Sequence, residues 1–223
     1  MSTTRTTTDR LTREAVLREA LALLDDEGFD ALTMRRLSDR LGVVPMALYR
    51  HVANKDDLIL GVIDLAVSLV PIPSIELDWR SGLHELAHSI RRTMLQHPGI
   101  VGPVVTQPAL GVHALVIGEY GLAVMRDAGF ALEDAERGPK TVLTYALGFV
   151  ALEVPRLGQL ESARNGMPNG LDIAYDELPI EIFPHTVEVR PRAEELVSET
   201  QFEYGLQRIL DGIELHAPRK RRR

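Results

Sequence analysis

Apolar residues recur every three or four positions along the chain, which is the spacing of one face of an α-helix. The first such stripe comprises Val16, Ala20, Leu23 and Leu24. The second comprises Met34, Leu37 and Leu41. Thr12 and Thr33 precede these stripes as N-caps, and Gly28 and Gly42 follow them, because glycine is common just past a helix C-terminus. The pattern predicts one helix and, directly after it, a second and much shorter one.

Two further helices are predicted before a proline-bearing break at residues 71–73. The third runs from Val44 to Val52, with Pro45 in its first turn, where a missing N–H costs little. The fourth begins after Asn54 as N-cap, and its apolar body covers residues 58–70. Two short helices that are joined by a tight glycine turn and braced by longer helices predict a helix-turn-helix.

The rest of the chain also favours helices, so the predicted fold class is all-α, with an N-terminal three-helix domain joined to a larger helical body. Helices are predicted at residues 83–96, 112–128, 138–154 and 193–215. A loop with Pro103 and Pro108 is predicted before the second of these helices, and an irregular loop over residues 158–192. The predicted divisions are a flexible N-terminus (1–10), the helix-turn-helix domain (11–53), a connecting helix (54–70), the helical body (71–217) and a basic tail (218–223).

Charge is distributed unevenly along the chain. The whole sequence has 25 Lys and Arg against 32 Asp and Glu, a formal net charge of −7, which excludes nucleic-acid binding through bulk positive charge. Residues 31–55 reverse this sign, with one acidic residue, Asp39, and five basic ones. The basic residues are Arg35, Arg36, Arg40, Arg50 and Lys55. A cationic segment on an acidic body indicates one face suited to an anion.

Other features of the composition exclude several classes of protein. The absence of cysteine excludes a disulfide framework, Cys-ligated zinc, an iron–sulfur cluster and a thiol nucleophile. No stretch approaches the roughly 18–20 apolar residues of a membrane span, and the N-terminus lacks the apolar run of a signal peptide. We therefore expect a cytoplasmic protein without a membrane partner.

The predicted third helix carries an unusual set of side chains for a surface. Its candidate contact residues are Pro45, Met46, Ala47, Tyr49, Arg50 and His51. Small and apolar side chains can approach thymine methyl groups, and the tyrosine, arginine and histidine can reach phosphates or base edges. The alternative is a plain helical hairpin in which Leu48 and Tyr49 belong to the core.

Residues 32–64, LTMRRLSDRLGVVPMALYRHVANKDDLILGVID, resemble the DNA-binding domain of the tetracycline-repressor (TetR) family of bacterial transcription regulators. The shared pattern is a threonine-started helix, a Leu-Gly-Val turn, a Leu-Tyr pair, a histidine, and Asn-Lys before the fourth helix. The resemblance covers roughly residues 11–70. It continues more loosely through Trp79, Gln96-His97-Pro98, Ala128-Gly129-Phe130 and Gly148.

The resemblance implies a role for each matching residue on DNA. It assigns phosphate contacts to Thr33, Tyr49, His51 and Lys55. It assigns base reading to Arg35, through a bidentate guanine contact, and base-edge contacts to the face formed by Pro45, Met46 and Ala47. Arg50 falls where the family varies and is expected to contact the backbone or set specificity. Because each protomer reads one half-site, the expected partner is a near-palindromic, double-stranded operator.

For the helical body, the resemblance implies a ligand-binding and dimerisation domain. The last two long helices would pair with those of a second copy in a homodimer, and a small-molecule effector would release a repressor from its operator. The candidate ligand-binding residues are Leu86, Ile90, Met94, Glu119, Tyr120, Leu143, Tyr145 and Leu147. The apolar ones are alternatively plain core, and Glu119 and Tyr145 are informative only if buried. Val104 stands near the position of the tetracycline repressor's metal-holding histidine, so an apolar ligand is expected rather than magnesium–tetracycline.

The segment His84-Glu85-Leu86-Ala87-His88 is a literal HExxH motif. Residues i and i+4 share a helix face, so both imidazoles could hold one zinc ion with Glu85 as general base, which makes a zinc hydrolase the alternative function. No third ligand follows at a recognisable spacing, because the next acidic residue is Glu119. We therefore predict no enzyme, no cofactor and no metal site, with His84 and His88 as the weak metal candidates. A DNA-binding protein that needs no ligand is a further alternative.

Overall fold

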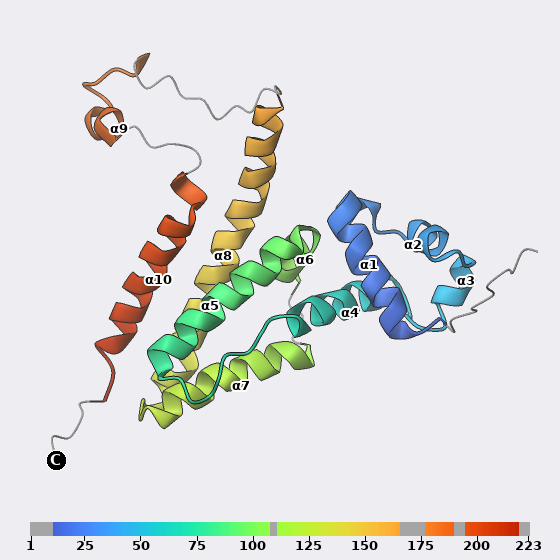
Figure 1. The fold of residues 1–223 in the computed structure, drawn as a ribbon, viewed down its shortest axis with the longest axis horizontal. Coiled ribbons are helices and arrows are strands. Elements are labelled where there is room, and N and C mark those ends of the chain that lie inside the picture. The colour runs from blue at the N-terminus through green and yellow to red at the C-terminus, as the bar shows by residue number, and fades with distance from the viewer. Residues whose placement is uncertain (1–10, 108–110, 166–176, 190–194, 219–223) are drawn as a thin grey trace, which may run out of the picture. The chain divides into compact units, whose positions relative to one another are not determined.

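A computed structural model of the protein describes residues 11–107, 111–165, 177–189 and 195–218, and every regular element within these ranges is helical (Figure 1). The all-α prediction is therefore confirmed. The predicted flexible N-terminus and all but the first residue of the basic tail lie outside the described residues. The chain divides into two compact units, one formed by residues 1–69 and 97–115 and the other by residues 70–96 and 116–223. None of the described helices is long and apolar enough to cross a membrane.

The first unit contains the four predicted N-terminal helices and one more. Its helices are α1 (Arg13–Glu27), α2 (Met34–Leu41), α3 (Pro45–Leu48), α4 (Lys55–Ser68) and α6 (Pro98–Thr106), with a 3₁₀ turn at Phe29–Ala31. The predicted N-caps are confirmed. Thr12 Oγ1 accepts a hydrogen bond from the N–H of Ala15 (3.1 Å), and Thr33 Oγ1 accepts one from the N–H of Arg36 (3.1 Å). Asn54 caps α4 in the same manner.

Helix α6 packs against α1 and α4 and corrects the prediction of a loop with Pro103 and Pro108. Pro98 occupies the first helical turn, where no N–H is needed, and Pro103 is tolerated inside the helix, while Pro108 lies outside the described residues. A Cβ atom on Gly99 would lie 2.1 Å from the carbonyl oxygen of Leu24, so only glycine allows this approach to α1. Residues 97–115 therefore pack with the first unit, although the sequence placed them in the body.

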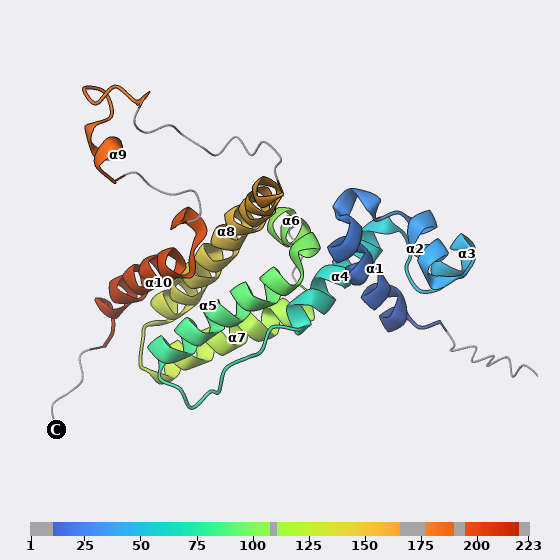
Figure 2. The same ribbon diagram turned by 45° about the horizontal axis from the view of Figure 1, so that its top comes forward.

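The second unit is built on three helices that lie side by side (Figures 1 and 2). These are α5 (Trp79–Gln96), α8 (Leu132–Arg164) and α10 (Glu199–Glu214). The unit also holds most of α7 (Val112–Asp127), the short α9 (Pro184–Val189) and a 3₁₀ turn at Glu195–Val197. Helix α8 extends beyond both ends of the predicted 138–154 helix, and α9 lies within the segment predicted as an irregular loop.

Basic side chains on one face of α5 meet acidic side chains of α10. On α5 they are Arg80, His84, His88 and Arg91. On α10 they are Glu199, Glu203, Asp211 and Glu214. Arg80 Nη2 lies 2.5 Å from Asp211 Oδ1 and Arg80 Nη1 lies 3.0 Å from Glu214 Oε2, while Arg91 contacts Glu199. The start of α5 thus meets the end of α10, so the two helices run antiparallel along a stripe of paired charges.

A buried ion pair joins α5 to α8 beneath this stripe. Arg91 is 8% exposed and Glu153 is 3% exposed, and the guanidinium donates to both carboxylate oxygens, at 2.8 and 2.6 Å. The guanidinium carbon also lies 5.0 Å from the centre of the Phe202 ring on α10. The hydrogen bonds to Glu153, and secondarily those to Glu199, raise the pKa of Arg91 despite the opposing effect of burial. The three helices of the body therefore share one desolvated charge pair.

Glu153→Gln is expected to lower the free energy of unfolding by about 3 kcal/mol, because it leaves a buried guanidinium without its main partner. Glu199 remains as a second acceptor, which keeps the loss at the lower end of the range for such pairs. The measurement is urea unfolding, followed by far-UV circular dichroism at one protein concentration. Glu136→Gln, which breaks the exposed α8 pair with Lys140, is the matched control. Equal losses in the two variants would contradict the proposed weight of the buried pair.

Candidate nucleic-acid interface

The turn between α2 and α3 is set by one left-handed residue and by two buried leucines. Gly42 has φ +65°, and the N–H of Val43 donates to the carbonyl of Ser38 (3.0 Å), which closes the end of α2. Leu37 on α2 and Leu48 on α3 are both fully buried. The two helices are therefore held to the same core on either side of a tight turn, as the sequence predicted.

Helix α3 turns most of its side chains outward. Val44, Met46 and Tyr49 are 68%, 70% and 47% exposed, whereas Leu48 points into the core. The regular helix ends at Leu48 rather than at the predicted Val52, because hydrogen-bonded turns replace it from Tyr49 onward. The exposure of Tyr49 also counts against the hairpin alternative, which placed this ring in the core. A one-turn helix that exposes large apolar groups is suited to contact with another molecule.

Only part of the basic charge of this region is available to an anion. The guanidinium of Arg36 pairs with Glu27 of α1 at 2.6 Å. Arg40 pairs with Glu19 at 2.6 Å and with Asp26 at 2.8 Å, also on α1. These ion pairs fasten α2 to α1, so the excess of positive charge read from residues 31–55 overstates what the surface offers.

The side chains of Arg35 and Arg50 are exposed and make no hydrogen bond or ion pair within the described part of the chain. Lys55, the first residue of α4, is also exposed, and its ammonium lies 5.6 Å from the centre of the Phe29 ring. Thr33 is exposed and uses its oxygen as the cap of α2, so its hydroxyl hydrogen is left to donate elsewhere. None of the nine residues predicted to contact DNA is buried.

An ion pair that the sequence analysis missed holds the end of α3 in place. The guanidinium of Arg13 on α1 meets both carboxylate oxygens of Asp57 on α4, at 2.8 and 3.1 Å. Arg13 Nη1 also donates to the carbonyl of His51 (2.7 Å), and Asp57 Oδ2 accepts from the N–H of Ala53 (2.8 Å). The hydrogen bonds from Arg13, followed by the one from Ala53, lower the pKa of Asp57. Partners so far apart in the chain leave no local pattern that could reveal them.

In the second unit, half of the eight predicted ligand residues belong to the core. Leu86, Ile90, Met94 and Tyr120 are buried, whereas Leu143, Tyr145 and Leu147 are partly exposed. The hydroxyl of Tyr120 donates to the carbonyl of Ser74 (3.2 Å), and that of Tyr145 donates to the carbonyl of Phe202 (2.9 Å). Glu119 is exposed, so its carboxylate gives no indication of a ligand.

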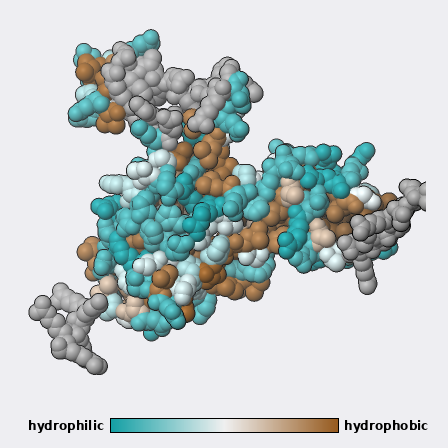
Figure 3. Space-filling model, in the orientation of Figure 1, coloured by the Kyte–Doolittle hydropathy of each residue, from teal (hydrophilic) through white to brown (hydrophobic). Residues whose placement is uncertain are grey.

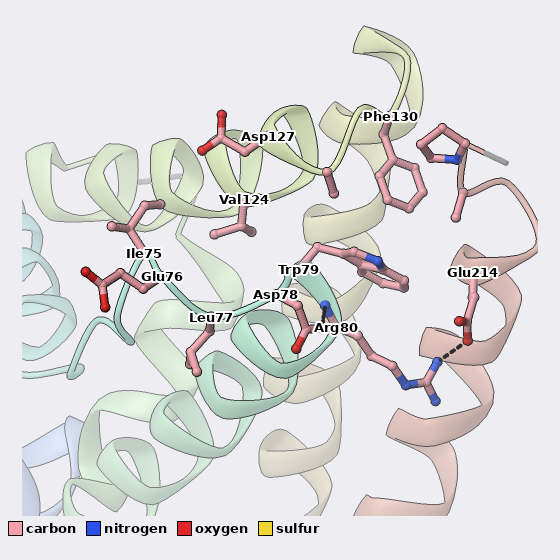
Figure 4. Close-up of a pocket in the computed structure, with 13 residues that line it drawn as sticks. Ile75, Glu76, Leu77, Asp78, Trp79, Arg80, Val124, Asp127, Phe130 and Glu214 are labelled. Carbon is pink, nitrogen blue, oxygen red and sulfur yellow. Dashed lines mark hydrogen bonds and ion pairs between the residues drawn. The ribbon is translucent and has the colours of Figure 1, made fainter. Parts of the chain in front are cut away.

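A cavity of about 860 Å³ lies elsewhere in the second unit, at the start of α5 (Figure 4). Trp79 and Phe130 line it with their rings edge to face, 5.2 Å between centres, and Arg80 reaches toward Glu214 at its rim. None of the predicted ligand residues lines this cavity. The sequence singled out Trp79 and Phe130 only as marks of the family resemblance.

The two histidines of the HExxH motif do share one face, and a carboxylate from another helix joins them. Glu203 of α10 lies 3.0 Å from His84 Nε2 and 2.9 Å from His88 Nε2. Burial acts to raise the pKa of Glu203, but hydrogen bonds from Gln207, His88 and His84 outweigh it and lower the pKa to about 2. Glu85, the presumed general base, instead pairs with Arg92 at 2.9 Å. The sequence found no third ligand because Glu203 comes from a different helix, 115 residues after His88.

Two short helices around a glycine turn, with the second presenting an exposed face, define a helix-turn-helix DNA-binding protein. Residues 16–62 match the family described as bacterial regulatory proteins, tetR family, and residues 72–216 match the tetracyclin repressor-like C-terminal domain. The chain belongs to the TetR family of transcription regulators. Proteins of this family are regulators rather than enzymes, so a zinc hydrolase is not favoured.

Relatives along most of the chain agree with this assignment. An HTH-type transcriptional regulator of Saccharopolyspora erythraea is 33% identical over 145 residues, which are 64% of this chain and 61% of that protein, less than two thirds of its length. An HTH-type transcriptional repressor of Mycobacterium tuberculosis is 30% identical over 207 residues, 89% of this chain and 78% of its own.

Solved structures extend the likeness to the fold. The TetR family protein ActR of Streptomyces coelicolor, in complex with actinorhodin, superposes with a TM-score of 0.79 at 29% identity, covering 95% of this chain and 99% of its own. BioQ with its natural double-stranded DNA operator superposes with a TM-score of 0.65 at 28% identity, covering 93% of this chain and 100% of its own.

Asp57→Asn is expected to lower the free energy of unfolding by about 0.5–1 kcal/mol at pH 7, because it removes a partly exposed, bidentate ion pair. The folded pKa of Asp57 lies below its unfolded value of about 3.9, so the stabilisation is present above that value and is lost as the pH falls through the folded pKa. Urea unfolding at pH 7 and near pH 3 should therefore show the difference between the two proteins shrinking in acid. A difference that is constant with pH would assign the effect to packing.

Proposed function

We propose that the protein is a homodimeric transcription repressor that binds a near-palindromic operator and is released from it by a small, largely apolar ligand. The observation that carries the proposal is the outward face of α3 together with Arg35 and Arg50, two arginines that have no side-chain partner among the described residues. The relatives support the proposal, since one is a repressor, one is bound to an operator and one is bound to a small molecule.

Arg35 is the proposed reader of sequence. It lies in the first turn of α2, and its exposed guanidinium can make the bidentate contact to O6 and N7 of guanine. Met46 offers an apolar surface to base edges, and Ala47 and Pro45 leave room for the duplex to approach. Phosphate contacts from Thr33, Tyr49, His51 and Lys55 would hold this face in register.

The proposed dimer surface consists of the outward faces of α8 and α10. On α8 the exposed positions at helical spacing are Thr141, Thr144, Gly148 and Leu152. On α10 they are Tyr204, Arg208, Gly212 and Leu215, the last just past the helix end. Leu152, Tyr204 and Leu215 are 70%, 62% and 85% exposed, and Figure 3 shows hydrophobic surface on the second half of α8. Pairing with a second copy would cover these groups and tie two reading heads together.

The effector is proposed to bind among α5, α7 and α8, against the predicted ligand residues other than Glu119. Four of these side chains, Leu86, Ile90, Met94 and Tyr120, pack as core, so a ligand must displace some of them and thereby favour one arrangement of the helices. Only a ligand that prefers one state over the other can shift the equilibrium of DNA binding. An apolar molecule fits this requirement, because Leu86, Ile90 and Met94 offer it no polar partner.

The experiment that tests the function is selection from a randomised duplex pool at moderate salt, followed by sequencing. Enrichment of an inverted repeat supports a dimeric, sequence-specific regulator. Enrichment of a single half-site contradicts the dimer, and no enrichment contradicts sequence-specific binding. Release of the selected duplex by apolar small molecules then separates a ligand-responsive repressor from a DNA-binding protein that needs no ligand.

Arg35→Ala is expected to weaken operator binding by about 1–3 kcal/mol and to relax specificity at one base pair. Arg36→Ala is the matched control, because the neighbouring arginine is held by Glu27 and is not offered to DNA. The measurement is the dissociation constant on the selected operator and on single-position variants of it. Equal losses on operator and random duplexes would remove Arg35 from base reading.

Lys55→Ala is expected to weaken binding to all duplexes alike and to reduce the slope of log affinity against log salt by about one unit, because one phosphate contact is lost. Lys140→Ala, on an exposed face of α8 in the second unit, should leave the slope unchanged. An unchanged slope in the Lys55 variant would place its ammonium away from the phosphates.

A further inference from the structure

The HExxH histidines and Glu203 form a three-sided cluster on the stripe between α5 and α10. Their ligand atoms, one from each residue, all lie within 4.8 Å of one another. One turn of α5 places both imidazoles on the same face, and Glu203 Oε2 lies 3.0 Å from His84 Nε2 and 2.9 Å from His88 Nε2. Two nitrogen ligands and one oxygen ligand thus converge on one point of the stripe.

Neighbouring groups orient these side chains as they do around metal ions. His88 Nδ1 lies 3.4 Å from Glu199 Oε1, so with an ion bound this carboxylate can hold the proton on Nδ1 while the Nε2 lone pair faces the ion. The side-chain amide of Gln207 donates to Glu203 Oε1 (2.7 Å) and fixes the carboxylate. A histidine that is oriented by one carboxylate and faces a second ligand is the arrangement that surrounds many zinc ions.

The charges around His88 favour a cation at the centre of the cluster. A neutral imidazole has one N–H and one lone pair, yet both ring nitrogens of His88 face carboxylate oxygens. One of these contacts therefore brings a lone pair against a negative oxygen unless the ring carries a second proton or a cation lies between the two groups. A divalent ion at the centre of the cluster would satisfy all three ligands at once.

The spacing also suits such an ion. Ligand atoms about 2.0–2.1 Å from zinc lie roughly 3.3 Å apart in a tetrahedron. The two nitrogen–oxygen distances of 2.9 and 3.0 Å need to widen by only a few tenths of an ångström. His84 and Glu203 are about one-third exposed, and an open groove of about 410 Å³ beside His84 gives an ion access from solvent.

We propose that His84, His88 and Glu203 bind one zinc ion and thereby tie α5 to α10. Two imidazoles and a carboxylate favour zinc and its neighbours in the first transition row over magnesium or calcium, which prefer all-oxygen sites. Solvent completes the coordination. The site is a cross-link rather than a catalytic centre, because Glu85 is turned to Arg92 instead of to the ion.

The test is a titration of the full-length protein, freed of metal by a chelator, with Zn²⁺ by calorimetry and with Co²⁺ by visible absorption. The expected result is one ion per chain and the intense bands of four-coordinate cobalt. His84→Gln and His88→Gln should each weaken binding by more than about 100-fold. Glu199→Gln, which removes a carboxylate that faces His88 and also pairs with Arg91, should weaken binding by about 10–100-fold. His185→Gln, which changes an exposed histidine on α9, should leave the affinity unchanged.

Far-UV circular dichroism of each metal-free variant shows whether it still folds, so a lost site is distinguished from a lost structure. No binding to the wild-type protein overturns the proposal. Binding that persists in the His84→Gln/His88→Gln double variant also overturns it, because an adventitious ion is then held elsewhere. These readouts involve no DNA, so either outcome leaves the proposed repressor function to be judged by its own experiment.

Discussion

A helix of one turn cannot hold its shape in water, and the DNA-facing surface of this protein depends on one. Four residues form too few hydrogen bonds to offset the ordering of their backbone, so α3 exists only because its surroundings impose it. Leu48 packs its side chain into the core, and Gly42 forms the turn that precedes α3. Arg13 donates a hydrogen bond to the carbonyl of His51, which follows the helix. With its position fixed from the inside, every other side chain of α3 is left to face outward.

The same constraint explains how charge is divided in the first unit. Arg36 and Arg40 of α2 are paired with carboxylates of α1 and act as braces, whereas the side chain of Arg35 has no partner within the described ranges of the chain. Arginine serves two purposes here, because some arginines stabilise the fold through ion pairs and others are available to bind an anion. Here the helical period performs the separation, because residues three or four apart share a face and adjacent ones do not.

Local signals made much of the fold predictable. The caps at Thr12, Thr33 and Asn54 and the glycines after α1 and α2 act within one helical turn, so a short window of sequence contains both the residue and its effect. The starts of the N-terminal helices were therefore predicted closely, whereas the end of α3 was placed four residues too late. Helix α6 was missed because two prolines argue against a helix, although one sits where it does no harm.

The remaining errors concern partners that lie far apart in the chain. Nothing near Arg13 indicates Asp57, and nothing near the HExxH motif indicates Glu203, because tertiary packing alone brings them together. A charged residue within an apolar run was the one available hint. Glu153 interrupts such a run, between Leu152 and Val154, and its partner is Arg91. The candidate ligand residues were chosen from their positions on predicted helices and their side-chain types. These features identify residues of a core, but they do not show whether that core can open to admit a ligand.

The stripe of opposite charges between α5 and α10 constrains how this sequence can evolve. An apolar contact tolerates many single replacements of similar size, but a base that faces an acid becomes a repulsive pair if either changes sign alone. The residue types at positions 80, 84, 88 and 91 of α5 therefore depend on those at positions 199, 203, 211 and 214 of α10. Lineages descended from this sequence should exchange these residues in matched couples, so that the antiparallel pairing leaves a record in correlated substitutions.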